Sequence, residues 1–230
     1  MKKLLLITSI VIALNCYYIY AEEVSNMLNK IQWLGHDCFK ITNDKVIYTD
    51  PFELNKKDKA DIILITHSHY DHCSPEDVYK IQTPDTIIVA TEDCKKNLSG
   101  NIKIVKPGNK LDVKGIHIEA VPAYNINKKF HPKENNWVGY IFTIDEEKIY
   151  LAGDTDYIPE MKTFKVDIAL LPVSGTYVMT AEEAVKAALD IKPKIAIPMH
   201  YGSIVGSNSD AEKFAKELKG KIEVKILKKE

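Results

Sequence analysis

The sequence predicts an α/β protein in which two β-sheets pack face to face and helices cover their outer sides. The chain has 230 residues, and 45% of them are hydrophobic, which is enough for one large core. Segments typical of strands and helices alternate without a linker rich in glycine, proline and serine. The same order of elements occurs twice along the chain. The fold is therefore expected to consist of two similar halves.

The first half contains strands that lead into a helix with a well-defined start. Its predicted elements are strands at 31–41 and 45–52 around a turn at 42–44, a buried strand at 60–66, a helix at 74–82 and a strand at 84–91. Ser74 is a suitable N-cap for the helix, Pro75 fits its first position, and Asp77 follows three residues after the cap.

The second half repeats this order. Its predicted elements are two strands around an acidic turn within 137–155, a strand at 166–172, a helix at 180–191 and a strand at 193–200. Thr180 is the expected N-cap of this helix, with Glu183 at the capping-box position. Buried strands resemble one another because Ile, Val and Leu dominate them. A shared order of four elements nevertheless favours an internal duplication.

The charge balance argues against a nucleic-acid partner. The chain has 31 Lys and Arg residues against 32 Asp and Glu residues, so its net charge is −1. A protein that binds a phosphate backbone ordinarily carries a basic surplus. We therefore expect a small-molecule substrate. The lysine-rich end at 219–230 is interpreted as a solvated strand edge.

The first 22 residues differ from the rest of the chain. Two lysines precede an apolar run at 4–14, and the small residue Ala21 precedes two glutamates. This pattern predicts a secretory signal peptide, with an uncleaved N-terminal anchor or lipid attachment at Cys16 as alternatives. In each case we expect a folded domain at 23–230 that lies outside the cytoplasm, in the periplasm or cell envelope. Contact with a membrane would come only through the N-terminal segment.

The remaining cysteines do not indicate a disulfide framework. Cys38, Cys73 and Cys94 are an odd number and form no CxxC pair. Cys38 and Cys94 are expected to be small apolar core residues. Cys73 directly follows a histidine and could lie near a metal.

The heptapeptide THSHYDH, residues 66–72, contains three of the seven histidines in the chain. It follows a predicted buried strand and precedes a capped helix. His67 and His69, two apart on extended backbone, can face one point, whereas Asp71 and His72 can face a neighbouring point. Imidazole and carboxylate groups together suit Zn²⁺, Mn²⁺ or Fe²⁺.

Two further residues of these types follow later strands. Asp154 comes after the strand KIYLAG, and His200 comes after KIAIPM. Gly153 permits close approach of the backbone just before Asp154. The position of Asp154 and His200 at strand ends, together with the histidine cluster at 66–72, predicts a metal site.

These motifs resemble those of metallo-β-lactamase-fold hydrolases. HSHYDH matches their His-x-His-x-Asp-His signature, and AGDT and PMHYG resemble their later aspartate and final histidine. GHDCF, TDPF and VPAYN are most similar to the subgroup that contains ascorbate-phosphate lactonase and N-acylphosphatidylethanolamine phospholipase D. The resemblance implies a four-layer αβ/βα sandwich of two duplicated halves.

The resemblance also implies a set of metal ligands. His67 and His69 would bind a first metal ion, Asp71, His72 and His200 a second, and Asp154 would bridge both. The family usually has a histidine between the two halves, where this chain has Asn125. His131 on the following loop is favoured to replace it, with Asn125 as the alternative. His117 is expected to point outward. One or two Zn²⁺ ions are expected, with Mn²⁺ or Fe²⁺ as alternatives.

Other residues resemble groups around the family's cleft. Asp50 would accept a hydrogen bond from the outer N–H of a ligating histidine. His36 is expected beside the cleft, as a catalytic residue together with Asp71, and Tyr201 is expected to line a substrate pocket. For His36 and Asp50 the alternative is a turn residue, and for Tyr201 it is core packing. The segments at 125–136 and 174–179 are expected to shape the pocket.

The expected function is a metal-dependent hydrolase that uses a metal-activated hydroxide on an ester, lactone or phosphodiester. Asp71 would orient the hydroxide or relay its proton. An iron oxidoreductase on the same fold is one alternative, but those enzymes usually have Glu at the position of His69. A metal-binding module without catalysis is another, because the usual mid-chain histidine is missing. The sequence contains no GxSxG motif and no glycine-rich phosphate loop.

Overall fold

The computed structural model describes residues 27–55 and 58–230. The predicted signal peptide or anchor at 1–22 lies outside the described residues. Within the described part of the chain, no helix has both the length and the apolar character needed to cross a bilayer.

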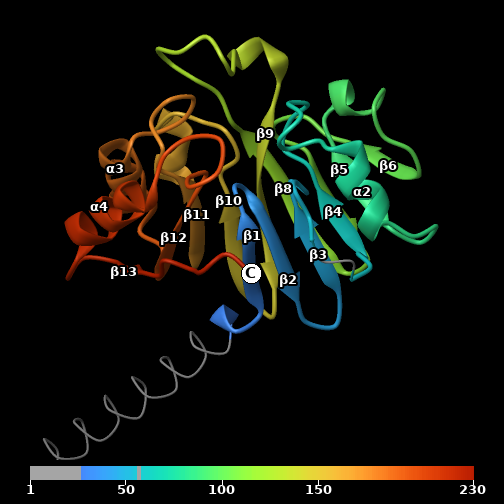
Figure 1. Cartoon of the computed structure of the whole chain (residues 1–230), viewed down its shortest axis with the longest axis horizontal. Coiled ribbons are helices and arrows are strands. Elements are labelled where there is room, and N and C mark those ends of the chain that lie inside the picture. Colours follow the sequence, from blue (N-terminus) through green and yellow to red (C-terminus); the bar gives the residue numbers. More distant parts are fainter. Residues whose placement is uncertain (1–26, 56–57) are drawn as a thin grey trace, which may run out of the picture.

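Two mixed β-sheets form the centre of the molecule (Figure 1). The first has the strand order β1-β2-β3-β4-β5-β6, with bounds Ile31–Gly35, Cys38–Thr42, Val46–Thr49, Ile62–Leu64, Ile87–Ala90 and Asn101–Ile104. The second has the order β13-β12-β11-β10-β9-β8-β7. In chain order from β7 its strands are Lys110–Val113, Ile116–Pro122, Val138–Ile144, Glu147–Leu151, Ile168–Pro172, Ile195–Met199 and Glu223–Val224.

The two sheets repeat one topology. In the first sheet, β1, β2 and β3 pair antiparallel, and β3 to β6 pair parallel. In the second sheet, β8, β9 and β10 pair antiparallel, and β10 to β13 pair parallel. Strand β7 adds one antiparallel strand at the edge of the second sheet. The predicted duplication of halves is therefore visible in the topology.

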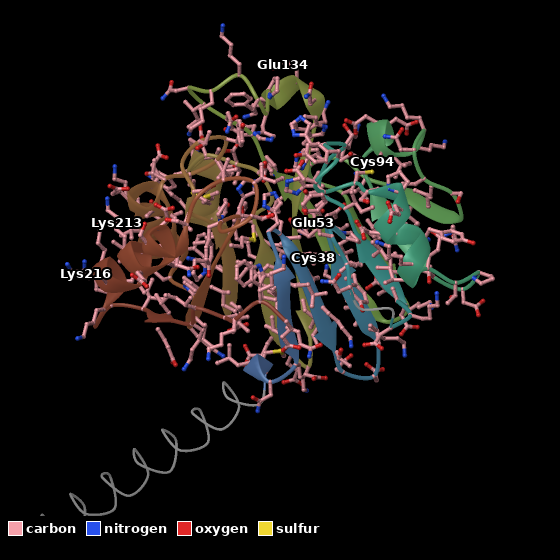
Figure 2. The ribbon with its side chains drawn as sticks, in the orientation of Figure 1. Cys38, Glu53, Cys94, Glu134, Lys213 and Lys216 are labelled. Atoms are coloured by element: carbon pink, nitrogen blue, oxygen red, sulfur yellow. The ribbon has the colours of Figure 1, made fainter. Side chains whose placement is uncertain are left out.

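Helices cover the outer faces of both sheets (Figure 1). The α-helices are α2 (Pro75–Ile81), α3 (Ala181–Ile191) and α4 (Asn208–Leu218), and the short 3₁₀ turns are η1 (Glu92–Cys94), η2 (Lys133–Asn135) and η3 (Pro159–Thr163). Helix α2 lies on the side of the first sheet, whereas α3 and α4 lie on the side of the second. Lys213 and Lys216, labelled in Figure 2, are on the exposed surface of α4, and Lys213 pairs with Glu182 of α3.

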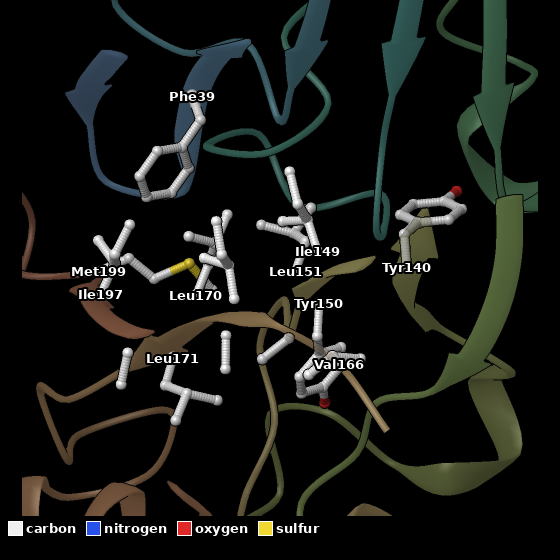
Figure 3. Close-up of a cluster of buried hydrophobic side chains, with 14 of the residues drawn as sticks. Phe39, Tyr140, Ile149, Tyr150, Leu151, Val166, Leu170, Leu171, Ile197 and Met199 are labelled. Carbon is white, nitrogen blue, oxygen red and sulfur yellow. The ribbon is translucent and has the colours of Figure 1, made fainter. Parts of the chain in front are cut away.

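Alternation along the strands divides the core into layers. In β4, Ile62 and Leu64 pack into the core between the sheets, whereas Ile63 faces the smaller core that includes Val78 of α2. The close-up in Figure 3 shows the same alternation in β11, where Leu170 and Leu171 lie on opposite sides of the ribbon. The order helix, sheet, sheet, helix confirms the predicted four-layer α/β sandwich.

Local capping signals position the helices as predicted. The Ser74 side chain accepts a hydrogen bond from the Asp77 backbone N–H at the start of α2. Thr180 and Glu183 form a reciprocal capping box at the start of α3. Both helices directly follow loops of the site described below, so the caps fix where those loops end.

The first predicted strand, 31–41, is wrong in one respect. It consists of two strands, β1 and β2, which pair antiparallel around a turn at His36 and Asp37. Gly35 and His36 both have positive φ, 110° and 53°, which reverses the chain within two residues. A pattern of buried residues continues on both sides of this turn, and it resembles one long strand.

Candidate metal centre

The histidine-rich segment forms a compact turn between β4 and α2. The backbone N–H groups of His72 and Cys73 both donate to the carbonyl of His69, at 3.1 and 2.8 Å. These bonds curl the chain immediately before the N-cap of α2. His67 and His72 are buried, whereas His69 is half-buried. The turn therefore holds its side chains at the end of the buried strand, as expected from the sequence.

Asp154 lies between two sets of histidine nitrogens. Its Oδ2 atom is 3.1 Å from Nε2 of His131 and 4.0 Å from Nε2 of His67. Its Oδ1 atom is 3.1 Å from Nε2 of His200 and 3.4 Å from Nε2 of His72. One carboxylate thus presents a different oxygen to each set, which is the geometry required of a bridging ligand.

Three groups of potential ligand atoms lie at this site, and within each group the atoms lie within 4.8 Å of one another. The first group is His67, His69, His131 and Asp154, and the second is His36, Asp71, His72 and His200. The third group, Asp37, His72 and Asp154, shares residues with the other two. In the first group, Nε2 of His67 is 3.0 Å from Nδ1 of His69. The structure brings together the seven residues that the sequence analysis favoured as metal ligands, and it adds His36 to the second group.

Several buried atoms of the centre have no hydrogen-bond partner among the described residues. Among them are Nε2 of His72, His131 and His200, and Oδ1 of Asp154. Leaving one buried polar atom unsatisfied costs about 1–3 kcal/mol, so four in one place indicate a missing partner. Imidazole nitrogens and carboxylate oxygens are the donors that Zn²⁺, Mn²⁺ and Fe²⁺ accept. The residues therefore fit one metal ion in each of the first two groups, with Asp154 shared.

Burial and charge act in opposite directions on the central carboxylate. Burial would raise the pKa of Asp154, but the charges of His200 and His72 outweigh it and hold that pKa well below its ordinary value. For His67, burial and the charge of His72 hold the pKa well below the ordinary value of histidine. An ionised Asp154 and a neutral His67 are the forms that bind a metal ion.

Carboxylate and hydroxyl partners orient two of the histidines. Oδ2 of Asp50 is 2.9 Å from Nδ1 of His72, and the same carboxylate accepts from the backbone N–H and hydroxyl of Thr66 at 2.8 and 2.7 Å. The Ser174 hydroxyl is 3.0 Å from Nδ1 of His200. These contacts direct Nε2 of both rings toward Asp154, which is the role that outer partners have in metal sites.

Asn125 holds the His131 loop and does not face the centre itself. Its Oδ1 accepts from the His131 backbone N–H at 3.0 Å and lies 3.1 Å from the His131 Nδ1. Its own backbone N–H donates to the His131 carbonyl at 2.7 Å. The Asn125 amide in turn donates to Asp156 and to the Tyr177 carbonyl, at 3.1 and 2.9 Å. His131 therefore reaches Asp154, while Asn125 fixes its ring.

His36 contacts the second group through Asp71. Nε2 of His36 is 3.0 Å from Oδ2 of Asp71. Burial lowers the pKa of His36 to about 4, so the ring is neutral near pH 7. Burial would raise the pKa of Asp71, but the hydrogen bond from His36 and the charges of His72 and His36 together outweigh it and lower that pKa to about 2. A neutral His36 therefore donates its Nε2–H to an ionised Asp71.

Three residues of the centre have backbone conformations that are rare for side-chain-bearing residues. His36, Asp50 and His200 have φ values of 53°, 33° and 59°. Such residues are uncommon outside turns and cost about 1–3 kcal/mol each. Their concentration here shows that the fold holds strained backbone where the polar groups converge.

Two aspartates beside the centre, the buried Asp37 and the half-buried Asp93, were not predicted from the sequence. Asp37 is fully buried 3.9 Å from Nδ1 of His72, and burial raises its pKa to about 8. Its only signal was its position directly after His36. Asp93 accepts from the Ser68 hydroxyl and the Trp137 indole N–H, at 2.6 and 2.7 Å. It lies in an acidic segment that resembles a surface turn.

Trp137 forms a wall of the first group. Its ring centroid lies 4.8 Å from that of His67 and 4.8 Å from that of His69.

Tyr201 is buried against Trp33 and, together with His36, lines a separate cavity of about 440 Å³. Its expected place in the substrate pocket is therefore not supported. His117 is exposed, as expected, and lies 3.2 Å from Asp112.

The three described cysteines are buried and form no disulfide with one another. Cys38 and Cys94 lie in the core, as expected. Cys73 belongs to neither ligand group, although it directly follows His72.

Gly153, directly before Asp154, is a backbone position of the centre that is expected to be sensitive to substitution. It has a φ of 62°, and a Cβ there would lie 3.0 Å from the Thr66 side chain and 3.2 Å from the Val138 carbonyl. Gly153→Ala should therefore lower the free energy of unfolding by about 2 kcal/mol or more and weaken metal binding. Chemical denaturation and metal analysis measure these effects.

Gly115 provides a matched control for that substitution. Its φ is 86°, but a Cβ there would meet nothing within 4 Å. Gly115→Ala carries the backbone strain without the clash and should leave metal binding unchanged. Equal losses of stability in the two variants, with equal metal content, would show that close packing at Gly153 is unimportant.

The family follows from a comparison with known proteins. Residues 30–200 match the model of the beta-lactamase superfamily domain, which is well over half of the chain. The chain belongs to this superfamily. The two duplicated sheets and the site at their strand ends are those of the metallo-β-lactamase fold, so the predicted fold family is confirmed. The finer resemblance to the lactonase and phospholipase D subgroup stays a prediction.

Several relatives share most of their length with this chain. A UPF0173 metal-dependent hydrolase of Thermoplasma acidophilum is 34% identical over 214 residues, covering 86% of this chain and 94% of the relative. A solved structure from Parabacteroides distasonis, described as a metal-dependent hydrolase, is 40% identical with a TM-score of 0.78, covering 86% and 93%. Igni18, a metallo hydrolase from Ignicoccus hospitalis, shares the fold at 24% identity and a TM-score of 0.71, covering 86% and 94%.

Proposed function

We propose that this protein is a metal-dependent hydrolase with two metal ions that share Asp154. The observation that carries the proposal is the placement of the two Asp154 oxygens, which face separate histidine sets at 3.1 to 4.0 Å. The relatives named as metal-dependent hydrolases support the same reaction class. Zn²⁺ is the proposed metal, with Mn²⁺ and Fe²⁺ compatible with the same donors.

Each side chain has a defined part in this proposal. His67, His69 and His131 would hold the first ion, and Asp71, His72 and His200 the second. When bound, such an ion pair lowers the pKa of water and polarises the substrate oxygen. His36 would position the Asp71 carboxylate, because its Nε2–H donates a hydrogen bond to Oδ2 of Asp71.

Asp71 is suited to orienting the attacking water. Its pKa of about 2 keeps it ionised near neutral pH, and because His36 occupies Oδ2, the other oxygen, Oδ1, can accept a hydrogen bond. A carboxylate with so low a pKa is rarely protonated near neutral pH, so it is poorly suited to relaying a proton. The two roles considered from the sequence, orientation and proton relay, are therefore not equally supported, and orientation is favoured.

An iron oxidoreductase is the less supported alternative. His69 is a nitrogen donor within the first ligand group. The resemblance on which the oxidoreductase idea rests implies Glu at this position.

The proposed function is tested with metal-free protein that is reloaded with Zn²⁺ or Mn²⁺. We expect hydrolysis of at least one of three probes, an ester (p-nitrophenyl acetate), a lactone (γ-butyrolactone) and a phosphodiester (bis-p-nitrophenyl phosphate). Chelation should abolish the activity, and His67→Ala should reduce it at least about 100-fold. Protein that binds two ions per chain but hydrolyses none of the probes would count against the proposal, most clearly if the iron-loaded form consumed O₂.

A further inference from the structure

The opening to the metal centre is a small pocket with one apolar side. It has a volume of about 210 Å³. One side presents potential metal ligands, including Asp71 and Asp154. The other side consists of Tyr70, Phe130, Tyr177 and Ile204. Ligand sites for drug-sized molecules commonly have volumes of about 300–1,000 Å³, so this pocket suits a smaller group.

Exposed apolar side chains gather at this pocket. Among the described residues, six large apolar side chains are exposed, namely Tyr70, Tyr79, Ile126, Phe130, Ile204 and Ile226. Three of these line the pocket, with exposures of 68% for Tyr70, 47% for Phe130 and 37% for Ile204. Single exposed apolar residues are ordinary, but their concentration around a concave, chemically active site indicates a surface that a ligand covers.

Aromatic contacts hold this apolar side in place. Phe130 and Tyr177 come from different loops, and their ring centroids are 4.7 Å apart in an edge-to-face arrangement. Tyr70 makes a similar contact with Phe52 at 5.9 Å. Rings that are already packed lose little freedom when a ligand binds, so they form a rigid apolar surface.

The pocket lacks a basic side chain. No Lys or Arg is among the described residues that line it. Lys128, on the same loop as Phe130, is engaged by the Asp156 carboxylate. Sites for phosphoryl groups commonly add Arg or Lys to the metal ions to balance the extra charge. A substrate with charge beyond the reacting group would find no partner here.

We infer that the substrate is an uncharged carboxylic ester or lactone whose short acyl or aryl group lies against Tyr70, Phe130, Tyr177 and Ile204. This inference rests on the proposed function. Hydrolysis adds water across the ester C–O bond: the hydroxyl joins the acyl carbon, and the proton goes to the departing oxygen. The carboxylic acid product then leaves from the same pocket.

The test compares substrates that differ in chain length. For the metal-loaded full chain, kcat/KM for p-nitrophenyl hexanoate should exceed that for p-nitrophenyl acetate by about tenfold or more, since each buried CH₂ contributes about fourfold. Bis-p-nitrophenyl phosphate should have a lower kcat/KM than either of these two esters.

Phe130→Ser should remove most of the preference for hexanoate while metal content stays unchanged. Tyr79→Ser, at an exposed tyrosine of α2 outside this pocket, is the matched control and should retain the preference.

A binding measurement gives a second readout that does not depend on turnover. By calorimetry on the metal-loaded protein, hexanoate should bind at least about tenfold more tightly than acetate, which corresponds to burial of about two of its four additional CH₂ groups. Adipate has the same number of carbons with a second charge, and it should bind more weakly than hexanoate.

The outcomes separate the two proposals. Ester hydrolysis without a chain-length preference, equal binding of adipate and hexanoate, or a preference for the phosphodiester would each overturn the inference and leave the hydrolase intact. Tighter binding of hexanoate with no hydrolysis of any probe would overturn the hydrolase but keep the apolar subsite.

Discussion

Replacing Asp154 by asparagine is expected to remove both metal ions and to lower hydrolytic activity by about 10³-fold or more. The carboxylate is the only described group that faces both histidine sets, with Oδ2 at 3.1 Å from His131 and Oδ1 at 3.1 Å from His200. An amide of the same size offers one neutral oxygen, and its NH₂ group would point a donor at nitrogens that must act as ligands. Metal analysis after reconstitution measures the loss.

Asp77→Asn is the matched control for that substitution. Asp77 is also a buried aspartate, but it accepts from the backbone N–H groups of Glu53 and Leu54, at 3.0 and 2.9 Å, and belongs to neither ligand group. Its replacement should lower stability and leave about two ions per chain. If Asp154→Asn retained two ions with the affinity of the unaltered protein, Asp154 would not be a bridging ligand.

The second large effect is expected at His131. His131→Ala should reduce the metal content from about two ions per chain to about one, because only the first group loses a donor. The second group keeps His72, His200 and Asp71, so its ion should remain. Activity should fall about 100-fold or more if both ions take part in catalysis. His117→Ala, at an exposed histidine outside both groups, should change neither quantity.

Asn125→Ala distinguishes a ligand from the residue that orients it. Without the Asn125 amide, His131 keeps its imidazole but loses two contacts, at 3.0 and 3.1 Å. Removing such an outer partner typically costs about 10–100-fold in metal affinity, so excess metal should restore full occupancy. The same excess should not restore His131→Ala. A variant series in which Asn125→Ala loses the ion permanently and His131→Ala keeps it would reverse these roles.

Much of the fold could be predicted because its signals are local. The caps at Ser74 and Thr180 mark the starts of α2 and α3, and buried runs of Ile, Val and Leu mark the central parallel strands. Strands β6 and β7 were not predicted, because each lies at a sheet edge and has only four residues, which is too short for its alternation to stand out. The β1–β2 turn was missed because positive φ at His36 cannot be inferred from its residue type.

The candidate site was predictable only in part. His67, His69, Asp71 and His72 lie within one heptapeptide, so their proximity follows from the sequence. The position of His131 depends on Asn125, which is fixed by Asp156 and by the Tyr177 carbonyl, 31 and 52 residues further along the chain. The buried environment of Asp37 and the contacts of Asp93 depend on packing between distant segments. A single sequence contains no local signal for such contacts.

Anomalous diffraction at the zinc absorption edge, on crystals of the zinc-loaded protein, tests the central claim most directly. Two anomalous peaks are expected, about 3.5–4 Å apart, with the Asp154 carboxylate between them. One peak should mark an ion bonded to His67, His69 and His131, and the other an ion bonded to Asp71, His72 and His200. A fully loaded crystal with no peak beside Asp154, or with zinc bound only elsewhere on the surface, would contradict the proposed centre.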